Sequence, residues 1–105
     1  MKILLGECVP WSVRKLLTGH ECQTAGYCGW GGLTNGDLLR VAEAEFDWFI
    51  TADQNLRYQQ NLTGRKLAIL ELSTNDLRRI EAAAAELEAL VAAMLPSEYR
   101  RWVVL

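Results

Sequence analysis

Short apolar segments alternate with longer polar or amphipathic ones along this chain of 105 residues. Near-continuous runs of aliphatic and aromatic residues predict buried β-strands, and residues 21–24 carry a weaker strand signal. The predicted strands are 1–5, 21–24, 48–51, 67–72 and 101–105. Helical patterns lie between them, at residues 11–17, 36–45, 54–61 and 73–94. Strands that alternate with helices in this way predict an α/β fold with a mainly parallel sheet covered on both faces.

The ends of the helices carry recognisable signals. Asn35 is a predicted N-cap for the helix that ends near Glu45, and Ser73 or Thr74 for the long helix that ends near Met94. Five of the eight glycines lie in the segment 26–36, which predicts a long loop. Long loops in small domains are usually functional or mobile.

The composition limits the classes of protein that this chain can belong to. A chain of this length is expected to form one domain, residues 1–105. Half of its residues are hydrophobic, and a net charge of −2 argues against a strongly basic nucleic-acid module. Three cysteines without a CxxC pair, and the single His20, make a structural zinc site unexpected. We expect no membrane span, because the longest uncharged run is too short, and we expect a cytoplasmic protein with reduced thiols.

Three acidic residues are predicted to meet at one edge of the sheet. Glu7 follows the first strand, Asp53 follows the third, and Asp37 begins the helix after the glycine-rich loop. The carboxyl ends of parallel strands are where ligands and metals collect. Magnesium and manganese prefer oxygen ligands, and such an ion activates water for phosphodiester hydrolysis. Glu7, Asp37 and Asp53 are therefore the candidate catalytic and metal-binding residues.

Each of these acids also has a structural interpretation. Asp53 could cap the helix that follows it, and Asp37 would gain about 0.3–1 kcal/mol from the dipole of its own helix. Glu7 could be an ordinary solvated acid. Two further acids are set aside: Asp76 is expected to serve its own helix, and Asp47 precedes a strand and so belongs at the opposite edge.

Basic and aromatic side chains offer weaker indications. Arg14-Lys15 and similar basic residues could hold phosphates, although solvated helix and turn charges are the simpler interpretation. Of the four tryptophans, Trp30 in the glycine-rich loop is the candidate for a substrate or partner surface.

Several segments, taken in order, resemble a known family. They are Met1 to Pro10 (MKILLGECVP), His20-Glu21, Gly29-Trp30, Gly32-Leu33, Asn35-Gly36-Asp37-Leu38-Leu39, Phe49-Ile50-Thr51-Ala52-Asp53-Gln54-Asn55-Leu56 and Tyr58-Gln59-Gln60-Asn61-Leu62. Together they resemble the short PIN-like proteins, small bacterial proteins similar to VapC-type toxins. The resemblance implies a PIN-like three-layer α/β/α sandwich and a Mg²⁺- or Mn²⁺-dependent ribonuclease site. It also implies an antitoxin protein as partner.

The chain departs from the family pattern at the end of the first strand. The usual Leu-Asp-Glu-Asn is here Leu5-Gly6-Glu7-Cys8, so the first acid falls at Gly6. Asn55 stands where many PIN proteins place one more acid. Three explanations fit: Glu7 substitutes for the acid, the protein binds without cutting, or Gly6 is an engineered change. Cys8 in place of asparagine favours natural drift.

These observations leave two main functions and one weaker one. The first is a PIN-like endoribonuclease acting as the toxin of a toxin–antitoxin pair, impaired by Gly6. The alternative is a catalytically degenerate PIN-like protein that binds RNA or a protein. The third is a homodimer built on the apolar stripe Leu87, Leu90, Val91 and Met94, although such stripes are more often core within one chain.

Overall fold

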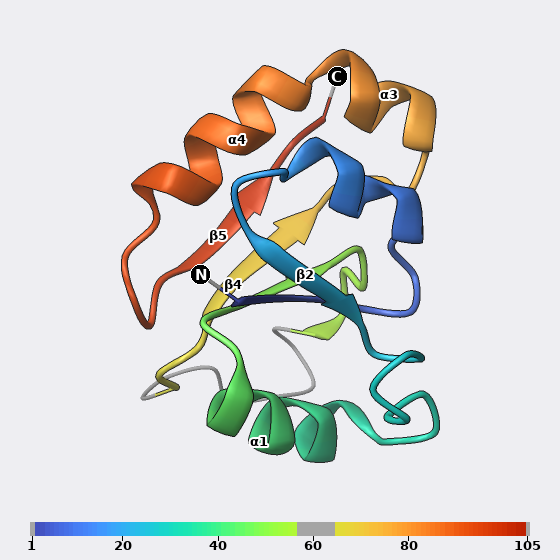
Figure 1. The fold of residues 1–105 in the computed structure, drawn as a ribbon, viewed down its shortest axis with the longest axis vertical. Helices are drawn as coiled ribbons and strands as arrows, with labels where there is room; N and C mark the ends of the chain where they lie inside the picture. Colours follow the sequence, from blue (N-terminus) through green and yellow to red (C-terminus); the bar gives the residue numbers. More distant parts are fainter. Residues whose placement is uncertain (1, 57–64, 105) are drawn as a thin grey trace.

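The computed structural model describes residues 2–56 and 65–104, in which strands and helices alternate (Figure 1). The strands are β1 (Lys2–Leu5), β2 (Glu21–Thr24), β3 (Trp48–Thr51), β4 (Ala68–Leu72) and β5 (Tyr99–Trp102). The helices are the 3₁₀-helix η1 (Trp11–Leu16) and the α-helices α1 (Asn35–Glu45), α3 (Leu77–Ala82) and α4 (Ala84–Ala93). None of the described helices is long and apolar enough to cross a membrane.

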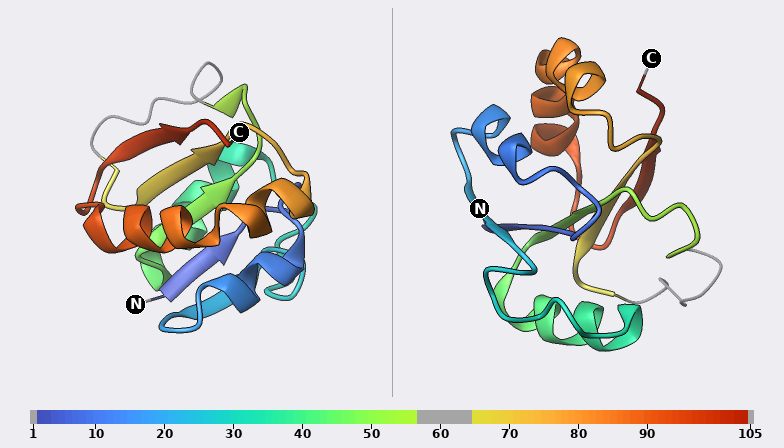
Figure 2. Two further views of the ribbon diagram at one scale, coloured as in Figure 1. Left: turned by 90° about the horizontal axis from the view of Figure 1, so that it is seen from above. Right: turned by 90° about the vertical axis from the view of Figure 1, so that its right-hand side faces the viewer.

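The described strands form one sheet in the order β2-β1-β3-β4-β5, and every neighbouring pair is parallel. Helix α1 lies on one face, and η1, α3 and α4 lie on the other (Figure 2). The predicted three-layer α/β/α sandwich with a mainly parallel sheet is thus confirmed. Because the strands are parallel, all of their carboxyl ends lie along one edge of the sheet.

The core is divided into two layers by the sheet. Ile50 belongs to the layer under η1, α3 and α4, whereas the adjacent Phe49 belongs to the layer under α1. Both faces are buried, which explains why the strand reads as a continuous apolar run. Leu87 and Val91 of α4 are fully buried in the first layer. The apolar stripe of this helix therefore packs within the chain.

Three helix boundaries differ from the prediction. Helix α1 begins at Asn35, and its N-cap is Thr34, whose side chain accepts a hydrogen bond from the Asp37 amide. Helix α3 is capped by Asp76, as its expected role implied, and not by Ser73 or Thr74. The predicted single helix 73–94 is wrong, because the chain leaves helical geometry at Ala83, with φ −110° and ψ 24°. Alanine favours helix at every position, but this propensity does not fix where a helix axis turns.

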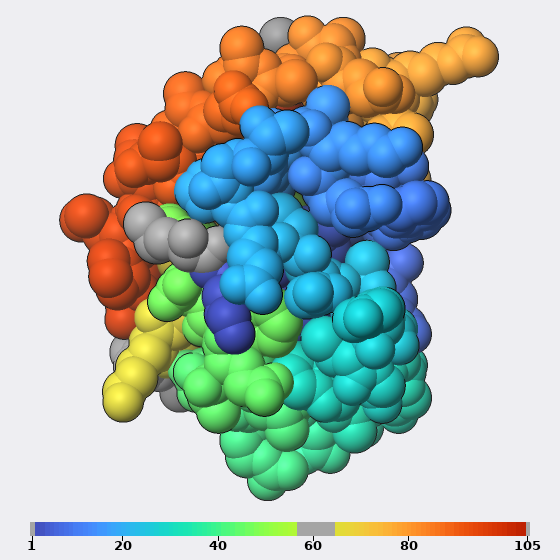
Figure 3. All heavy atoms as spheres, in the orientation of Figure 1, coloured from blue at the N-terminus to red at the C-terminus, as the bar shows by residue number. Residues whose placement is uncertain are grey.

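Smaller differences concern helix type and strand ends. The predicted helix 11–17 is a 3₁₀-helix, and the last strand begins at Tyr99 and not at Arg101. Most of the predicted helix 54–61 lies outside the described residues. The part of the glycine-rich segment that precedes α1, residues 26–34, is cyan in Figure 3 and forms the surface between η1 and α1. That position brings the segment to the edge of the sheet where the strands end.

Candidate functional site

A hollow of about 480 Å³ lies at the carboxyl edge of the sheet. Its lining includes Glu7 from the loop after β1 and Asp53 from the loop after β3. The glycine-rich segment supplies Trp30, and the start of α1 supplies Asn35. The structure therefore brings two of the three predicted acids to one hollow.

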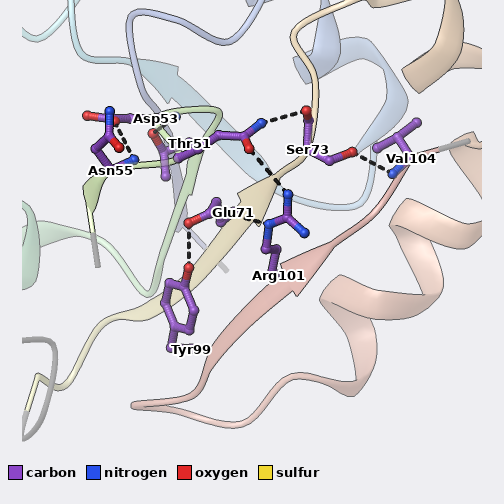
Figure 4. A network of polar contacts seen from close by, with 9 residues as sticks. Thr51, Asp53, Asn55, Glu71, Ser73, Tyr99, Arg101 and Val104 are labelled. Carbon is purple, nitrogen blue, oxygen red and sulfur yellow. Dashed lines mark hydrogen bonds and ion pairs between the residues drawn. The ribbon is translucent and has the colours of Figure 1, made fainter. Parts of the chain in front are cut away.

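Hydrogen bonds on both oxygens orient the Asp53 carboxylate. Oδ1 accepts from the Asn55 amide at 3.0 Å, and Oδ2 accepts from Asn35 Nδ2 at 3.1 Å. The Asp53 amide itself donates to Thr51 Oγ1 at 3.0 Å (Figure 4). The first contact closes a turn at the start of the loop, whereas most of the helix that Asp53 could cap lies outside the described residues. A carboxylate oxygen has two lone pairs, so both oxygens retain capacity for a further ligand.

The Glu7 carboxylate lies directly over Gly31. A Cβ atom at position 31 would stand 2.4 Å from Glu7 Oε1, which no side chain tolerates without movement. Glycine at this position therefore lets the carboxylate pack closely against the backbone of the loop. Gly31 thus contributes to the site by its lack of a side chain, beside the Trp30 that the same segment supplies.

Replacing Gly31 by alanine is expected to move the Glu7 carboxylate and leave the fold intact. The clash falls on the far end of a flexible side chain, so stability should change by no more than about 0.5 kcal/mol. The ¹³C carboxyl resonance of Glu7 should shift, and that of Asp53 should not. Gly32→Ala is the matched control, because a Cβ there meets no atom within 4 Å. Equal shifts in both variants would contradict this account of Gly31.

Asp37 does not line this hollow. Its carboxylate pairs with Arg40 at 3.0 Å, and the side chain is half exposed on the first turn of α1. The loop does fold back to the sheet edge, as the sequence led us to expect, but the residue that it delivers is Asn35. Among the described residues, no group of three or more His, Cys, Asp or Glu could hold a metal.

Cys8 joins the two loops that carry the acids. Its Sγ lies 3.4 Å from the Ala52 amide, which donates to it, and 3.7 Å from Thr51 Oγ1. In the sequence this cysteine stands out as a departure from the family pattern. In the structure it fixes the loop of Glu7 against the loop of Asp53.

A polar network built on the buried Glu71 carboxylate reaches the loop of Asp53. Glu71 on β4 is fully buried; it accepts from Tyr99 Oη at 2.5 Å and from Arg101 Nε at 2.9 Å. Arg101 Nη2 then donates to Gln54 Oε1 at 3.2 Å, and Gln54 Nε2 donates to the Ser73 carbonyl at 2.6 Å (Figure 4). Because Gln54 follows Asp53 and also lines the hollow, the network fixes the loop that carries this acid.

Sequence reasoning did not find this network, although one signal was present. Glu71 is the only charged residue in the otherwise aliphatic strand Ala68–Leu72. Buried carboxylates are almost always paired, so such a residue predicts a partner. The partner could not be chosen from the sequence, because Tyr99 and Arg101 come from a strand that is adjacent only in the folded sheet.

Comparison of the chain with protein-family models, with curated proteins and with solved structures found no match. The fold and the hollow together define the class: an α/β/α protein with two carboxylates at the carboxyl edge of a parallel sheet.

Proposed function

We propose that this protein is a PIN-like, metal-dependent endoribonuclease of the cytoplasm, and the toxin of a toxin–antitoxin pair. The observation that carries the proposal is the shared hollow of Glu7 and Asp53. Two carboxylates from neighbouring strand ends, open to solvent on one side, suit a reaction on a phosphodiester. The resemblance of the segments around them to PIN-like proteins supplies the choice of RNA as substrate.

The residues of this hollow fit a hard divalent cation. Mg²⁺ keeps several water ligands and uses one or two protein carboxylates, which Glu7 and Asp53 can provide. Mn²⁺ accepts the same oxygen ligands. When bound, such an ion would polarise a phosphoryl oxygen and lower the pKa of a bound water. The protein's own part is to hold these carboxylates in place, through Asn35 on Asp53 and Gly31 beneath Glu7.

Asp37 belongs to the proposal through the family resemblance. Both side chains of its ion pair with Arg40 are exposed to solvent, and such pairs contribute only about 0–1 kcal/mol to stability. Replacing Arg40 by a metal ion as the partner of Asp37 would therefore cost little stability. Asp37→Asn tests the assignment, because only an acid that serves the site should lower activity when it is neutralised.

A second candidate function is a degenerate PIN-like protein that binds RNA or a protein without cutting. The observation that favours it is Gly6, which lines the hollow where the family places an acid. A glycine there removes one carboxylate from the site. The two candidate functions share the fold and differ in whether RNA is cleaved.

The test is an RNA cleavage assay with Mg²⁺ and Mn²⁺. The proposal expects metal-dependent cleavage that Asp53→Asn and Glu7→Gln each reduce by roughly a hundredfold or more, because each removes a charged group from the reacting site. Glu88→Gln, which removes an exposed acid on α4, is the control and should retain full activity. Expression of the chain without its antitoxin should also arrest growth. RNA binding without cleavage at high Mn²⁺ would favour the degenerate protein.

A further inference from the structure

A second and a third hollow continue from the candidate site along the edge of the sheet. The second, about 640 Å³, shares Glu7 and Cys8 with the first. The third, about 400 Å³, shares Trp11, Thr24 and Tyr27 with the second. We name the second and third hollows the aromatic groove. Its shared lining residues connect the acids at the strand ends to the outer side of the edge strand β2.

Two exposed aromatic side chains dominate the aromatic groove. Trp11 is 55% exposed and Tyr27 is 80% exposed, whereas Trp48 and Trp102 are buried. Trp30, the tryptophan that the sequence favoured, packs edge-on against Phe46 at 5.9 Å. Large aromatic rings left in water mark a surface that receives a partner with flat or apolar faces.

Cations accompany the exposed tryptophan. The Arg14 guanidinium lies 4.5 Å from the centre of the Trp11 ring, and Lys15 Nζ lies 5.7 Å from it. Arg14 also lines the third hollow beside Cys22, and burial raises the pKa of the Cys22 thiol, so that group adds no negative charge there. The outer part of the groove thus combines aromatic faces with positive charge.

We propose that the aromatic groove binds single-stranded nucleic acid. Bases stack on Trp11 and Tyr27, and the phosphates lie toward Arg14 and Lys15, so that the strand leads into the hollow of Glu7 and Asp53. Stacking platforms beside a basic track are how proteins hold single strands without reading their sequence. The onward path to the acids rests on the proposed ribonuclease function; the binding itself does not require cleavage.

A protein partner is the other class of occupant for this surface. Among the described strands, β2 lies at the edge beside β1 and could receive an added strand from a peptide or a second copy. Main-chain pairing of that kind does not call for exposed aromatic rings or for cations stacked on them. These features, and the continuity with the carboxylates, favour an anionic single strand.

The experiment measures fluorescence anisotropy of a labelled oligouridine of about twelve nucleotides, in EDTA so that no cleavage occurs. Trp11→Ala and Tyr27→Ala should each weaken binding roughly five- to a hundredfold, the usual range for loss of one stacked base. Trp11→Phe keeps an aromatic face and should recover most of the affinity. Leu95→Ala is the matched control, because Leu95 is 68% exposed and lies outside the groove.

The contribution of the cations is measured by the salt dependence of binding. Arg14→Gln should weaken binding and reduce the slope of log affinity against log salt by about 0.7, the value for one phosphate contact on a single strand. Arg79→Gln removes a cation whose side chain is 62% exposed on α3 and should leave the slope unchanged. A double-stranded RNA of the same length should compete poorly, because its bases are already stacked.

Each outcome decides one question. If the oligouridine does not bind, or if Trp11→Ala and Leu95→Ala weaken its binding equally, the proposal that the aromatic groove binds single-stranded nucleic acid is overturned. A change in oligomeric state with Trp11→Ala and no oligonucleotide binding would assign the surface to a protein and overturn the proposal as well. Trp11-dependent binding without cleavage in Mn²⁺ would support the groove and reject the ribonuclease. RNA cleavage that neither Trp11→Ala nor Tyr27→Ala reduces would support the ribonuclease and reject the groove.

Discussion

Replacing Gly6 by aspartate is expected to raise metal-dependent RNA cleavage by roughly a hundredfold or more. The substitution places a carboxylate at the position where the PIN-like proteins that the sequence resembles carry their first acid. Position 6 lines the same hollow as Glu7 and Asp53. A third negative group there would hold a divalent cation more tightly and help to orient the attacking water. The loss of such a group commonly costs two or more orders of magnitude in rate.

The structure can accept the larger residue at a modest cost. A Cβ atom at position 6 would lie 3.3 Å from the Phe49 ring and 3.4 Å from Thr51 Oγ1. The first contact is tight, and the buried ring must shift by a few tenths of an ångström, which we expect to cost about 1 kcal/mol of stability. Thr51 Oγ1 already accepts from the Asp53 amide, so its hydroxyl proton can be donated to the new carboxylate.

The control for this prediction separates charge from size. Gly6→Asn has nearly the same volume and meets the same neighbours, but it carries no charge, so cleavage should remain at the level of the present chain. Both variants should show a similar loss of thermal stability. If the aspartate variant also fails to cut RNA under conditions in which it is folded, the ribonuclease proposal fails for this protein and the binding function takes its place.

Arg101→Ala is expected to be the most destabilising single change in the polar network, at about 3 kcal/mol. It removes the cation from Glu71, whose side chain is fully buried, and leaves Tyr99 as the donor to that carboxylate. Breaking a buried ion pair typically costs 3–5 kcal/mol. We expect a loss at the lower end of this range, because the Arg101 side chain is about one third exposed. Thermal unfolding should show Tm reduced by more than about 10 °C.

Two further variants test the cause of this loss. Arg79→Ala breaks the exposed pair with Asp76, at 3.9 Å, and should cost no more than about 1 kcal/mol. Adding Glu71→Gln to Arg101→Ala should recover part of the stability, because an amide is far less costly to bury than an unpaired carboxylate. Equal losses for Arg101→Ala and Arg79→Ala would show that the buried pair contributes little.

The same network also connects stability with the site. Arg101 holds Gln54, which in turn lies between the Ser73 carbonyl and the loop of Asp53. The loss of Arg101 should therefore loosen this loop as well as the core. Arg101 lies far from Asp53 in the sequence, yet it contacts the loop of Asp53 at the edge of the sheet.

The sequence by itself determined the layered α/β architecture and the elements that point to the site. Continuous apolar runs such as Trp48–Thr51 indicated a strand buried on both faces, and the structure confirmed it. The position of Asp53 directly after that strand sufficed to bring it to the carboxyl edge. These inferences held because they depend on local periodicity and on the geometry common to all parallel sheets.

Only the tertiary structure decided which side chains meet. It brought Asn35, and not Asp37, into contact with Asp53, because a loop of many glycines has no preferred path that its residues reveal. It paired Glu71 with Tyr99 and Arg101, and it left Trp11 and Tyr27 in water while Trp48 was buried. Packing between segments that are distant in sequence decides which side chains pair and which remain exposed. No single segment of the chain determines either property.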